Sequence, residues 1–428
     1  MPKAKSMSIH FETIDWAYGS NIYEVNTRQY TAEGTFKAFQ QHLPRLKDMG
    51  VEILWFMPIT PIGKEKRLGT LGSYYACSDY TSINPEYGSL SDFKTLVSAA
   101  HDLGFKVIID WVANHTSFDH HWTKEHPEWY RKDEQGNFVE LHGWDDVIDL
   151  DYSNDALRAA MIKCMQFWVK ECGIDGFRCD MAHLVPLDFW EEARKACEET
   201  GCLFWLAECD VDEYLQVFDV SYAWRWMHAT EKFMRHEIGL KDINNILRDY
   251  MGYHEKAWKL FFTANHDENS WNGSEYEKYG SAAKAFAVFS LTWPGLPLIY
   301  SGQELPNLKR LKFFEKDTIE WREPAELHGF YKTLLQLRKE NKALHNEARL
   351  ICFSTDANEK VLAYLLVKDH QKVLVLLNLS GDERIKIDLA DPSVKGDYVN
   401  LFSGLMHSLN EREIFELQPW EYFVYATV

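Results

Sequence analysis

The feature that most constrains the fold is an alternation of strand-like and helix-like segments from about residue 21 to residue 340. The strand-like segments are short apolar runs, which is typical of parallel strands buried on both faces. They cover residues 21–26, 51–57, 105–110, 174–180, 203–208, 217–221, 260–265 and 296–301. Eight β/α units predict a TIM (β/α)8 barrel. An open doubly wound sheet is the alternative, but the chain has no G-x-G-x-x-G turn to recommend it.

Helical periodicity separates these strand-like segments. The clearest case has apolar residues at helical spacing: Leu157, Met161, Cys164, Trp168 and Cys172. Residues 36–49 show a similar pattern, but Pro44 interrupts it. Because proline removes a backbone donor from a helix interior, we expect the helix to kink or restart there.

Two regions depart from the alternation. Residues 115–154 are polar and aromatic with little periodicity, and a loop of this length inside a domain is usually functional. We therefore predict a small subdomain inserted after the third strand, beside the active face. After about residue 345, short β-like runs separated by turn signals predict a C-terminal all-β sandwich. These runs cover residues 350–354, 361–367, 373–379, 384–389, 398–402, 413–417 and 421–425. The predicted domains are a barrel (1–114 and 155–344), the insertion (115–154) and the sandwich (345–428).

Composition narrows the set of partners. The formal net charge of −19 argues against a nucleic-acid partner, which favours a basic patch. No apolar run is long enough to cross a membrane. The eight cysteines form no C-x-x-C pair, and the N-terminus has no apolar signal-like run. These features predict a cytoplasmic protein, or a secreted one if a leader has been removed, and they leave the oligomeric state unknown.

Acidic residues close several of the strand-like segments. Asp110, Asp180 and Glu208 end the third, fourth and fifth segments, and Asp267 follows the seventh. The active residues of TIM barrels lie at the C-terminal ends of strands, so four carboxylates at one face are hard to explain as helix caps. One carboxylate that attacks and one that moves the proton suffice to break a glycosidic bond with retention.

With these motifs in this order, the chain resembles glycoside hydrolase family 13, the α-amylase family, over nearly its whole length. Residues 110–115, 176–180, 208 and 265–267 carry the resemblance. It implies that Asp180 is the nucleophile and that Glu208 is the general acid and then the general base. It also implies that Asp267 stabilises the transition state.

The resemblance further implies a substrate-binding set: Tyr75, His115, Arg178 and His266. The two histidines resemble sugar-hydroxyl binders, and Tyr75 aligns with a tyrosine that stacks under the sugar, with Tyr74 as the competing choice. Arg178 lies two residues before Asp180, so both side chains point to the same side of a strand. There the guanidinium can keep the Asp180 carboxylate ionised.

Asp110 and Asn114 have supporting roles in this resemblance. The counterpart of Asp110 is structural and lies beneath the site, and that of Asn114 often binds calcium between the barrel and the long loop. Calcium requires several oxygen ligands, which Asp145, Asp146, Asp149, Asp151 or the Leu184 carbonyl could supply. The sequence does not decide whether this structural calcium binds, and the chemistry itself requires no cofactor.

The prediction is therefore a retaining hydrolase of α-1,4 bonds in starch-like α-glucans, acting through a covalent β-glycosyl-enzyme. The alternatives are an exo-acting α-glucosidase, an α-glucan transglycosylase with the same triad, and a non-catalytic carbohydrate-binding protein. The last typically lacks one or more of the carboxylates. We also expect one or two of six loop tryptophans to stack on the substrate: Trp122, Trp129, Trp144, Trp224, Trp226 and Trp271.

Overall fold

A computed structural model of the chain describes residues 11, 14–251, 258–345, 347–381 and 384–427. Eight parallel strands close into a barrel in the order β1-β10-β9-β8-β7-β6-β3-β2. The strands are β1 (Ile22–Val25), β2 (Ile53–Phe56), β3 (Lys106–Trp111), β6 (Gly176–Cys179), β7 (Phe204–Ala207), β8 (Val220–Tyr222), β9 (Trp258–Phe261) and β10 (Leu296–Tyr300). Each overlaps one predicted segment, which confirms the TIM barrel.

Helices surround this barrel. They are α2 (Phe36–Gln40), α3 (Leu43–Met49), α4 (Leu90–Asp102), α6 (Asp155–Cys172), α7 (Leu187–Cys197), α8 (Trp224–Met234), α9 (Leu240–Tyr250), α10 (Glu275–Tyr279), α11 (Ala283–Thr292) and α12 (His328–Glu340). The predicted interruption at Pro44 is confirmed, because α2 ends before it and α3 carries this proline in its first turn, where its missing N–H is not needed. Across the described ranges, no helix is both long and apolar enough to span a membrane.

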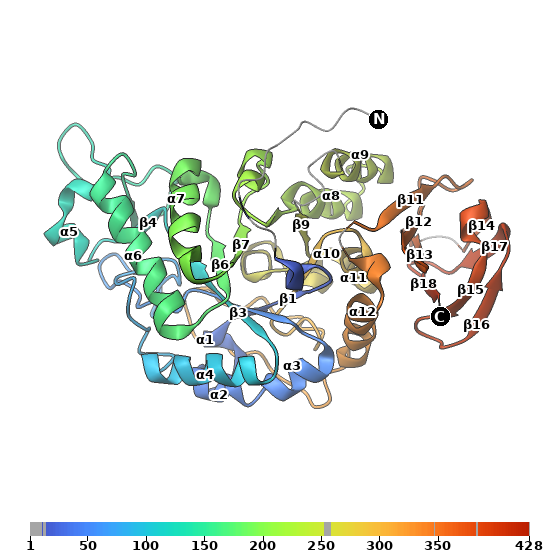
Figure 1. The fold of residues 1–428 in the computed structure, drawn as a ribbon, viewed down its shortest axis with the longest axis horizontal. Coiled ribbons are helices and arrows are strands. Elements are labelled where there is room, and N and C mark those ends of the chain that lie inside the picture. The colour runs from blue at the N-terminus through green and yellow to red at the C-terminus, as the bar shows by residue number, and fades with distance from the viewer. Residues whose placement is uncertain (1–10, 12–13, 252–257, 346, 382–383, 428) are drawn as a thin grey trace.

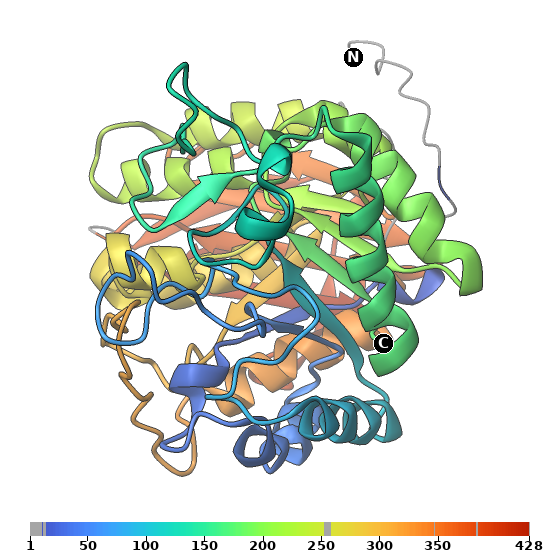
Figure 2. The same ribbon diagram turned by 90° about the vertical axis from the view of Figure 1, so that its left-hand side faces the viewer.

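The segment inserted after β3 has little regular structure. Its strands β4 (His115–Ser117) and β5 (Val147–Asp149) pair antiparallel, and the short helix α5 (Trp122–Glu125) lies between them in the chain. Figure 2 views the molecule from the side on which this segment lies in front of the barrel. The segment therefore borders the barrel mouth at His115.

Strands after α12 form two antiparallel sheets beside the barrel (Figure 1). The larger has the order β11-β12-β13-β18-β15-β16, and the smaller pairs β14 with β17. Their bounds are β11 (Arg349–Phe353), β12 (Val361–Lys368), β13 (Gln371–Asn378), β14 (Ile385–Ala390), β15 (Gly396–Asn400), β16 (Met406–Leu409), β17 (Arg412–Leu417) and β18 (Tyr422–Thr427). The predicted all-β sandwich is confirmed, whereas β16 was not predicted.

Alternation along β12 explains how the larger sheet is buried on both faces. Leu362, Tyr364 and Leu366 belong to the barrel-side core, whereas the intervening Val361 and Ala363 belong to the core between the two sheets. The sandwich is thus fixed to the helical side of the barrel and lies away from the mouth. The proposed domain boundaries stay predictions.

Candidate active site

Three carboxylates meet in one cleft at the barrel mouth. Asp180 and Glu208 directly follow β6 and β7, and Asp267 lies beyond the end of β9. All three line a cleft of about 410 Å³. Asp110, within β3, is instead buried beneath the site, where its carboxylate accepts hydrogen bonds from Arg178, Tyr75 and Trp55. The barrel thus brings together the acidic residues that the sequence singled out.

Arg178 connects these acidic groups. Its Nη1 lies 2.8 Å from an oxygen of Asp110 and 2.8 Å from an oxygen of Asp180, and its Nη2 lies 2.8 Å from Oε1 of Glu208. The side chain is fully buried, with its guanidinium over the Trp55 ring. Arg178 therefore holds the carboxylates from behind, and it does not line the cleft as a substrate-binding residue would.

Protonation differs between the two central carboxyl groups. Burial raises the pKa of Glu208 to about 8; Arg178 opposes the rise, and the charges of Asp180 and Asp267 add to it. Burial also raises the pKa of Asp180 to about 6, while Arg178 and a hydrogen bond with Glu208 lower it. Near pH 7 the site therefore holds a proton on Glu208 and a negative charge on Asp180.

The backbone after Asp180 also positions Glu208. Met181 has φ 41° and ψ 45°, a left-handed conformation that is uncommon for a residue with a side chain. Its N–H donates a hydrogen bond of 2.8 Å to Oε2 of Glu208. The turn that ends β6 therefore fixes the second oxygen of Glu208, while Arg178 fixes the first.

His266 lies among acidic partners. Its Nδ1 is 2.6 Å from Oε1 of Glu24, and its Nε2 is 3.2 Å from Asp267 and 2.7 Å from the Tyr75 hydroxyl. Burial lowers the pKa of His266, but Asp267 and Glu24 outweigh that effect and hold this pKa well above its ordinary value. The imidazolium in turn holds the pKa of Asp267 below its usual range, against the effect of burial.

Sequence reasoning missed Glu24. The residue lies in β1 and is fully buried. A signal was present, since Glu24 is a charged residue within an otherwise apolar strand. Burial of such a group without a partner is costly, so a nearby cation was to be expected.

Tyr75 and His115 line the cleft with the carboxylates. The Tyr75 ring stacks on His266 at 5.4 Å between centroids and 22° between planes. Tyr74 does not line this cleft, and the Arg28 guanidinium lies 4.2 Å from its ring centroid. Burial and the nearby charge of His142 lower the pKa of His115 to about 3, so this imidazole is neutral at pH 7.

The prediction that six tryptophans lie on loops is wrong for Trp122, which begins α5, and for Trp224 and Trp226, which lie in α8. The six side chains also divide by burial. Trp122, Trp129 and Trp226 are packed in the core. Trp144 and Trp271 line the cleft of the three carboxylates, together with Phe313 and Phe314. Trp224 lines an adjoining hollow that also contains Glu208, Asp267 and residues 209–211.

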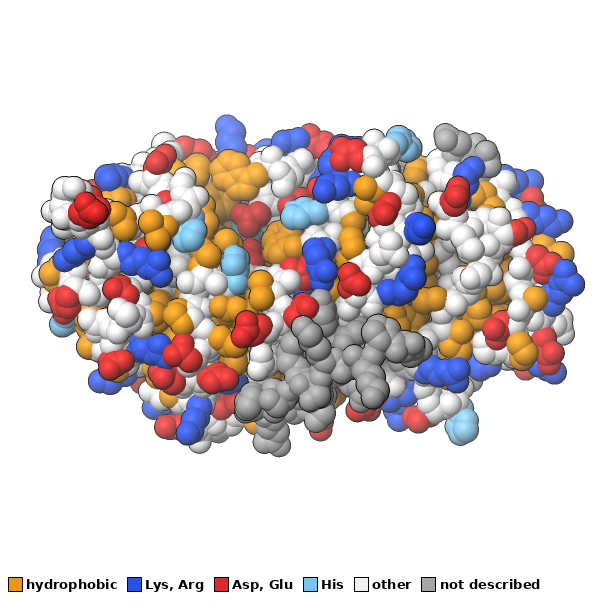
Figure 3. Space-filling model, turned by 90° about the horizontal axis from the view of Figure 1, so that it is seen from above, with side chains coloured by type: hydrophobic (Ala, Val, Ile, Leu, Met, Phe, Trp, Pro, Cys, Tyr) orange, Lys and Arg blue, Asp and Glu red, His pale blue; other side chains and the backbone are white. Residues whose placement is uncertain are grey.

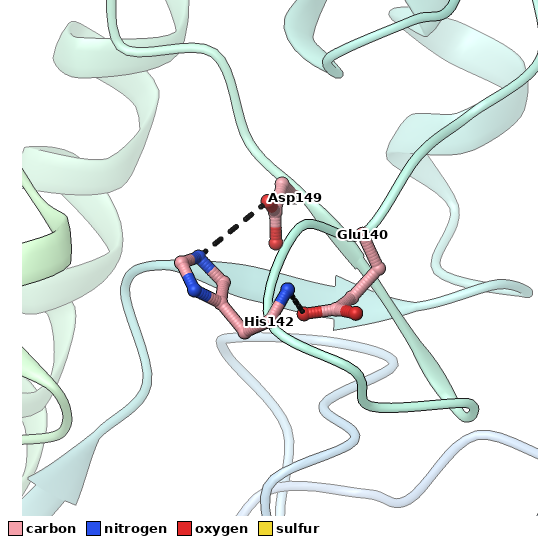
Figure 4. A group of neighbouring side chains, drawn as sticks. All are labelled: Glu140, His142 and Asp149. Atoms are coloured by element: carbon pink, nitrogen blue, oxygen red, sulfur yellow. Dashed lines mark hydrogen bonds and ion pairs between the residues drawn. The ribbon is translucent and has the colours of Figure 1, made fainter.

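Potential metal ligands gather in the inserted segment. Glu140, His142 and Asp149 each place a ligand atom within 4.8 Å of the others (Figure 4), and Asn114 Nδ2 lies 3.5 Å from Asp149. Glu140 already accepts hydrogen bonds from the backbone N–H groups of residues 142–144. Calcium prefers about six to eight oxygen ligands, so a set with an imidazole and an occupied carboxylate meets that need only in part. Calcium at Asn114 stays a prediction.

Comparison with known proteins decides the family. The family model for the α-amylase catalytic domain matches residues 18–140 and 125–323. The chain belongs to the α-amylase family. It is a glycoside hydrolase of that family, and the matched residues include all three cleft carboxylates.

Individual relatives agree with this assignment. A noncanonic maltogenic α-amylase, AmyB from Thermotoga neapolitana, is 32% identical with a TM-score of 0.88, covering 96% of this chain and 99% of AmyB. An α-amylase from Lactobacillus plantarum is 29% identical with a TM-score of 0.86 and the same coverage of 96% and 99%. The α-amylase MalA of Haloarcula japonica is 27% identical over 86% of this chain, which spans only 56% of MalA.

Proposed function

We propose that this α-amylase family member hydrolyses α-1,4-glucosidic bonds of starch-like α-glucans with retention of the anomeric configuration. The observation that carries the proposal is that Asp180 and Glu208 are held by the same cation. An oxygen of each carboxyl group lies 2.8 Å from a nitrogen of the Arg178 guanidinium. Such close groups fit a retaining enzyme, whose carboxyls lie about 5–5.5 Å apart, because an inverting enzyme needs room for a water between them.

In the first step, the Asp180 carboxylate attacks the anomeric carbon of the donor sugar. Glu208 simultaneously gives its proton to the glycosidic oxygen, and the leaving chain departs as an alcohol. Arg178 keeps the nucleophile ionised. Cationic His266 and anionic Asp267 can form charged hydrogen bonds with the sugar hydroxyls. The product of this step is a β-glycosyl-enzyme.

In the second step, Glu208 is ionised and accepts a proton from water. The water oxygen attacks the anomeric carbon from the face that the leaving chain vacated, and the bond to Asp180 breaks. Two inversions give net retention, and Glu208 regains the proton with which it began. The side chains thus supply each charge and proton, so the proposed chemistry requires no cofactor.

The substrate is proposed from the relatives and the cleft. Maltogenic AmyB and the α-amylases support an α-1,4-glucan, and the aromatic walls offer flat apolar surface to sugar rings. The alternatives with the same triad are an exo-acting α-glucosidase and a transglycosylase, in which a sugar replaces water in the second step. A non-catalytic binding protein is disfavoured because all three carboxylates line the cleft.

The proposed binding partner follows from the net charge of the chain, and the proposed cellular location follows from its cysteines. The net charge is −19, and acidic and basic side chains are interspersed over the face shown in Figure 3. This supports a neutral glucan rather than a nucleic acid as the partner. Seven cysteines are free thiols, which supports a reducing, cytoplasmic setting: Cys77, Cys164, Cys172, Cys179, Cys197, Cys209 and Cys352.

A timed product profile on maltoheptaose and soluble starch tests the proposal, with Asp180→Asn as the inactive control. We expect short maltooligosaccharides and loss of iodine colour only with the unaltered enzyme. Products longer than the substrate would show that the enzyme is a transglycosylase. Glucose as the only product would show that it is an exo-acting α-glucosidase. Equal turnover by Asp180→Asn would overturn the nucleophile assignment.

A further inference from the structure

A row of aromatic rings leads from the catalytic centre to the rim of the cleft. Phe313 lies nearly parallel to Tyr75, at 6.2 Å between ring centroids and 14° between planes. Trp271 follows at 5.3 Å from Phe313 and is also 5.7 Å from Phe314. With 53% of its surface exposed, Trp271 is unusually open for a tryptophan. The row therefore continues the surface on which Tyr75 lies and ends in an uncovered indole.

Trp144 approaches the same cleft from the opposite side. In the ring of eight barrel strands, three strands separate β3 from β9 in either direction. Trp144 lies in the segment after β3 and Trp271 in the segment after β9, so the two side chains arise from opposite sides of the mouth. Trp144 also packs edge-on against His115 at 5.1 Å.

The loop that carries Trp144 is braced. The Glu140 carboxylate accepts hydrogen bonds from the backbone N–H groups of His142, Gly143 and Trp144, the last at 2.8 Å. A loop fixed in this way presents its side chain without a large loss of conformational freedom on binding. Trp144 is thus a preorganised wall of the cleft.

These walls belong to the donor side of the scissile bond. Glu208 gives its proton to the leaving chain, which must therefore extend over the hollow formed by Glu208, residues 209–211 and Trp224. The donor sugar lies over Asp180 and Tyr75, in the cleft that contains both Trp144 and Trp271. The next sugar on the donor side would then meet the two indoles.

We propose that Trp271, backed by Phe313, and Trp144 form a binding site for the second donor glucose unit. The C–H faces of that ring pack between the indoles, which removes apolar surface on both partners from water. Occupation of this site favours release of two-unit fragments, namely maltose. The inference rests on the proposed function and deepens it by assigning the residues that set product length.

Two chromogenic substrates isolate this site. 4-Nitrophenyl α-maltoside places two glucose units on the donor side, whereas 4-nitrophenyl α-glucoside places only one. We expect Trp271→Ala to lower the ratio of kcat/KM on the maltoside to kcat/KM on the glucoside by about 10- to 100-fold, the range for losing one buried aromatic contact. Trp144→Ala should lower the same ratio. Trp271→Phe keeps an aromatic ring at this position and should retain most of the ratio of the unaltered enzyme.

Ile414→Ala is the matched control, because Ile414 is an exposed apolar residue of β17 in the sandwich. It should leave the ratio unchanged. A ratio that stays constant in both tryptophan variants would overturn the inference while starch hydrolysis still supported the proposed function. An unaltered enzyme that cleaves neither glycoside nor any α-glucan would instead refute the proposed function. If Trp271→Ala fails to fold, the ratio measured in Trp144→Ala decides the matter.

Discussion

Replacement of Glu208 by glutamine should stabilise the protein increasingly as the pH rises. The glutamine keeps the shape of the side chain, and its single amide oxygen can still accept the hydrogen bond from the Met181 N–H, while its NH2 group faces Arg178. It removes a carboxyl group whose pKa burial raises to about 8, from an ordinary value of 4.5. Below pH 4.5 the carboxyl is protonated in both folded and unfolded chains. As the pH rises through about 8, the unfolded chain loses this proton first, so the unaltered enzyme loses stability.

The magnitude follows from the two pKa values. Between pH 5 and pH 7, a group with a pKa of 4.5 unfolded and about 8 folded costs about 2.5 kcal/mol of folding free energy. The advantage of Glu208→Gln over the unaltered enzyme should grow by that amount over this interval.

Urea unfolding at pH 5, 6 and 7, followed by far-ultraviolet circular dichroism, measures the difference. Glu134→Gln, an exposed change in the inserted segment, controls for the loss of one negative charge and should stay within about 0.5 kcal/mol at each pH. A stability difference between Glu208→Gln and the unaltered enzyme that does not change from pH 5 to pH 7 would refute the protonated, buried Glu208 on which the mechanism depends.

Three further predictions concern the groups around the triad. Because catalysis needs ionised Asp180 and protonated Glu208, kcat/KM should form a bell with limbs near pH 6 and pH 8, and a rate that keeps rising above pH 9 would contradict this. Arg178→Met should destabilise the fold by about 3–5 kcal/mol and move the acidic limb upward, because it leaves buried carboxylates without their cation; an unmoved limb would assign that limb to another group. Glu24→Gln should lower the pKa of His266, so the imidazole signals of this residue in nuclear magnetic resonance should titrate at a lower pH. An unchanged titration midpoint would show that Glu24 does not raise this pKa.

The barrel could be predicted from the sequence because its strands are buried on both faces. Burial on both faces makes each strand a continuous apolar run, and these runs recur with helical segments between them. Pro44 likewise acts locally, so the break between α2 and α3 followed from one residue. β16 was missed because only one of its four residues is buried and its sequence lacks an apolar pattern.

The site was only partly predictable, for a physical reason. Asp180 and Glu208 lie directly after strands, so barrel closure alone brings them together. Phe313 lies in an aperiodic loop and Trp271 in a short π-helix, Glu268–Asn272. The path of both segments depends on contacts between distant parts of the chain, such as the hydrogen bond from the Ser270 hydroxyl to the Leu311 carbonyl. No local pattern in the sequence specifies that path, so the aromatic row became visible only in three dimensions.

The stereochemistry of the first product tests the central claim most directly. Proton nuclear magnetic resonance can follow the anomeric signals while the enzyme cleaves 4-nitrophenyl α-maltoside, before mutarotation mixes the anomers. Attack by Asp180 followed by water predicts that α-maltose appears first and that the β-anomer grows only later. Initial release of β-maltose would show a single inversion and would contradict a covalent intermediate on Asp180.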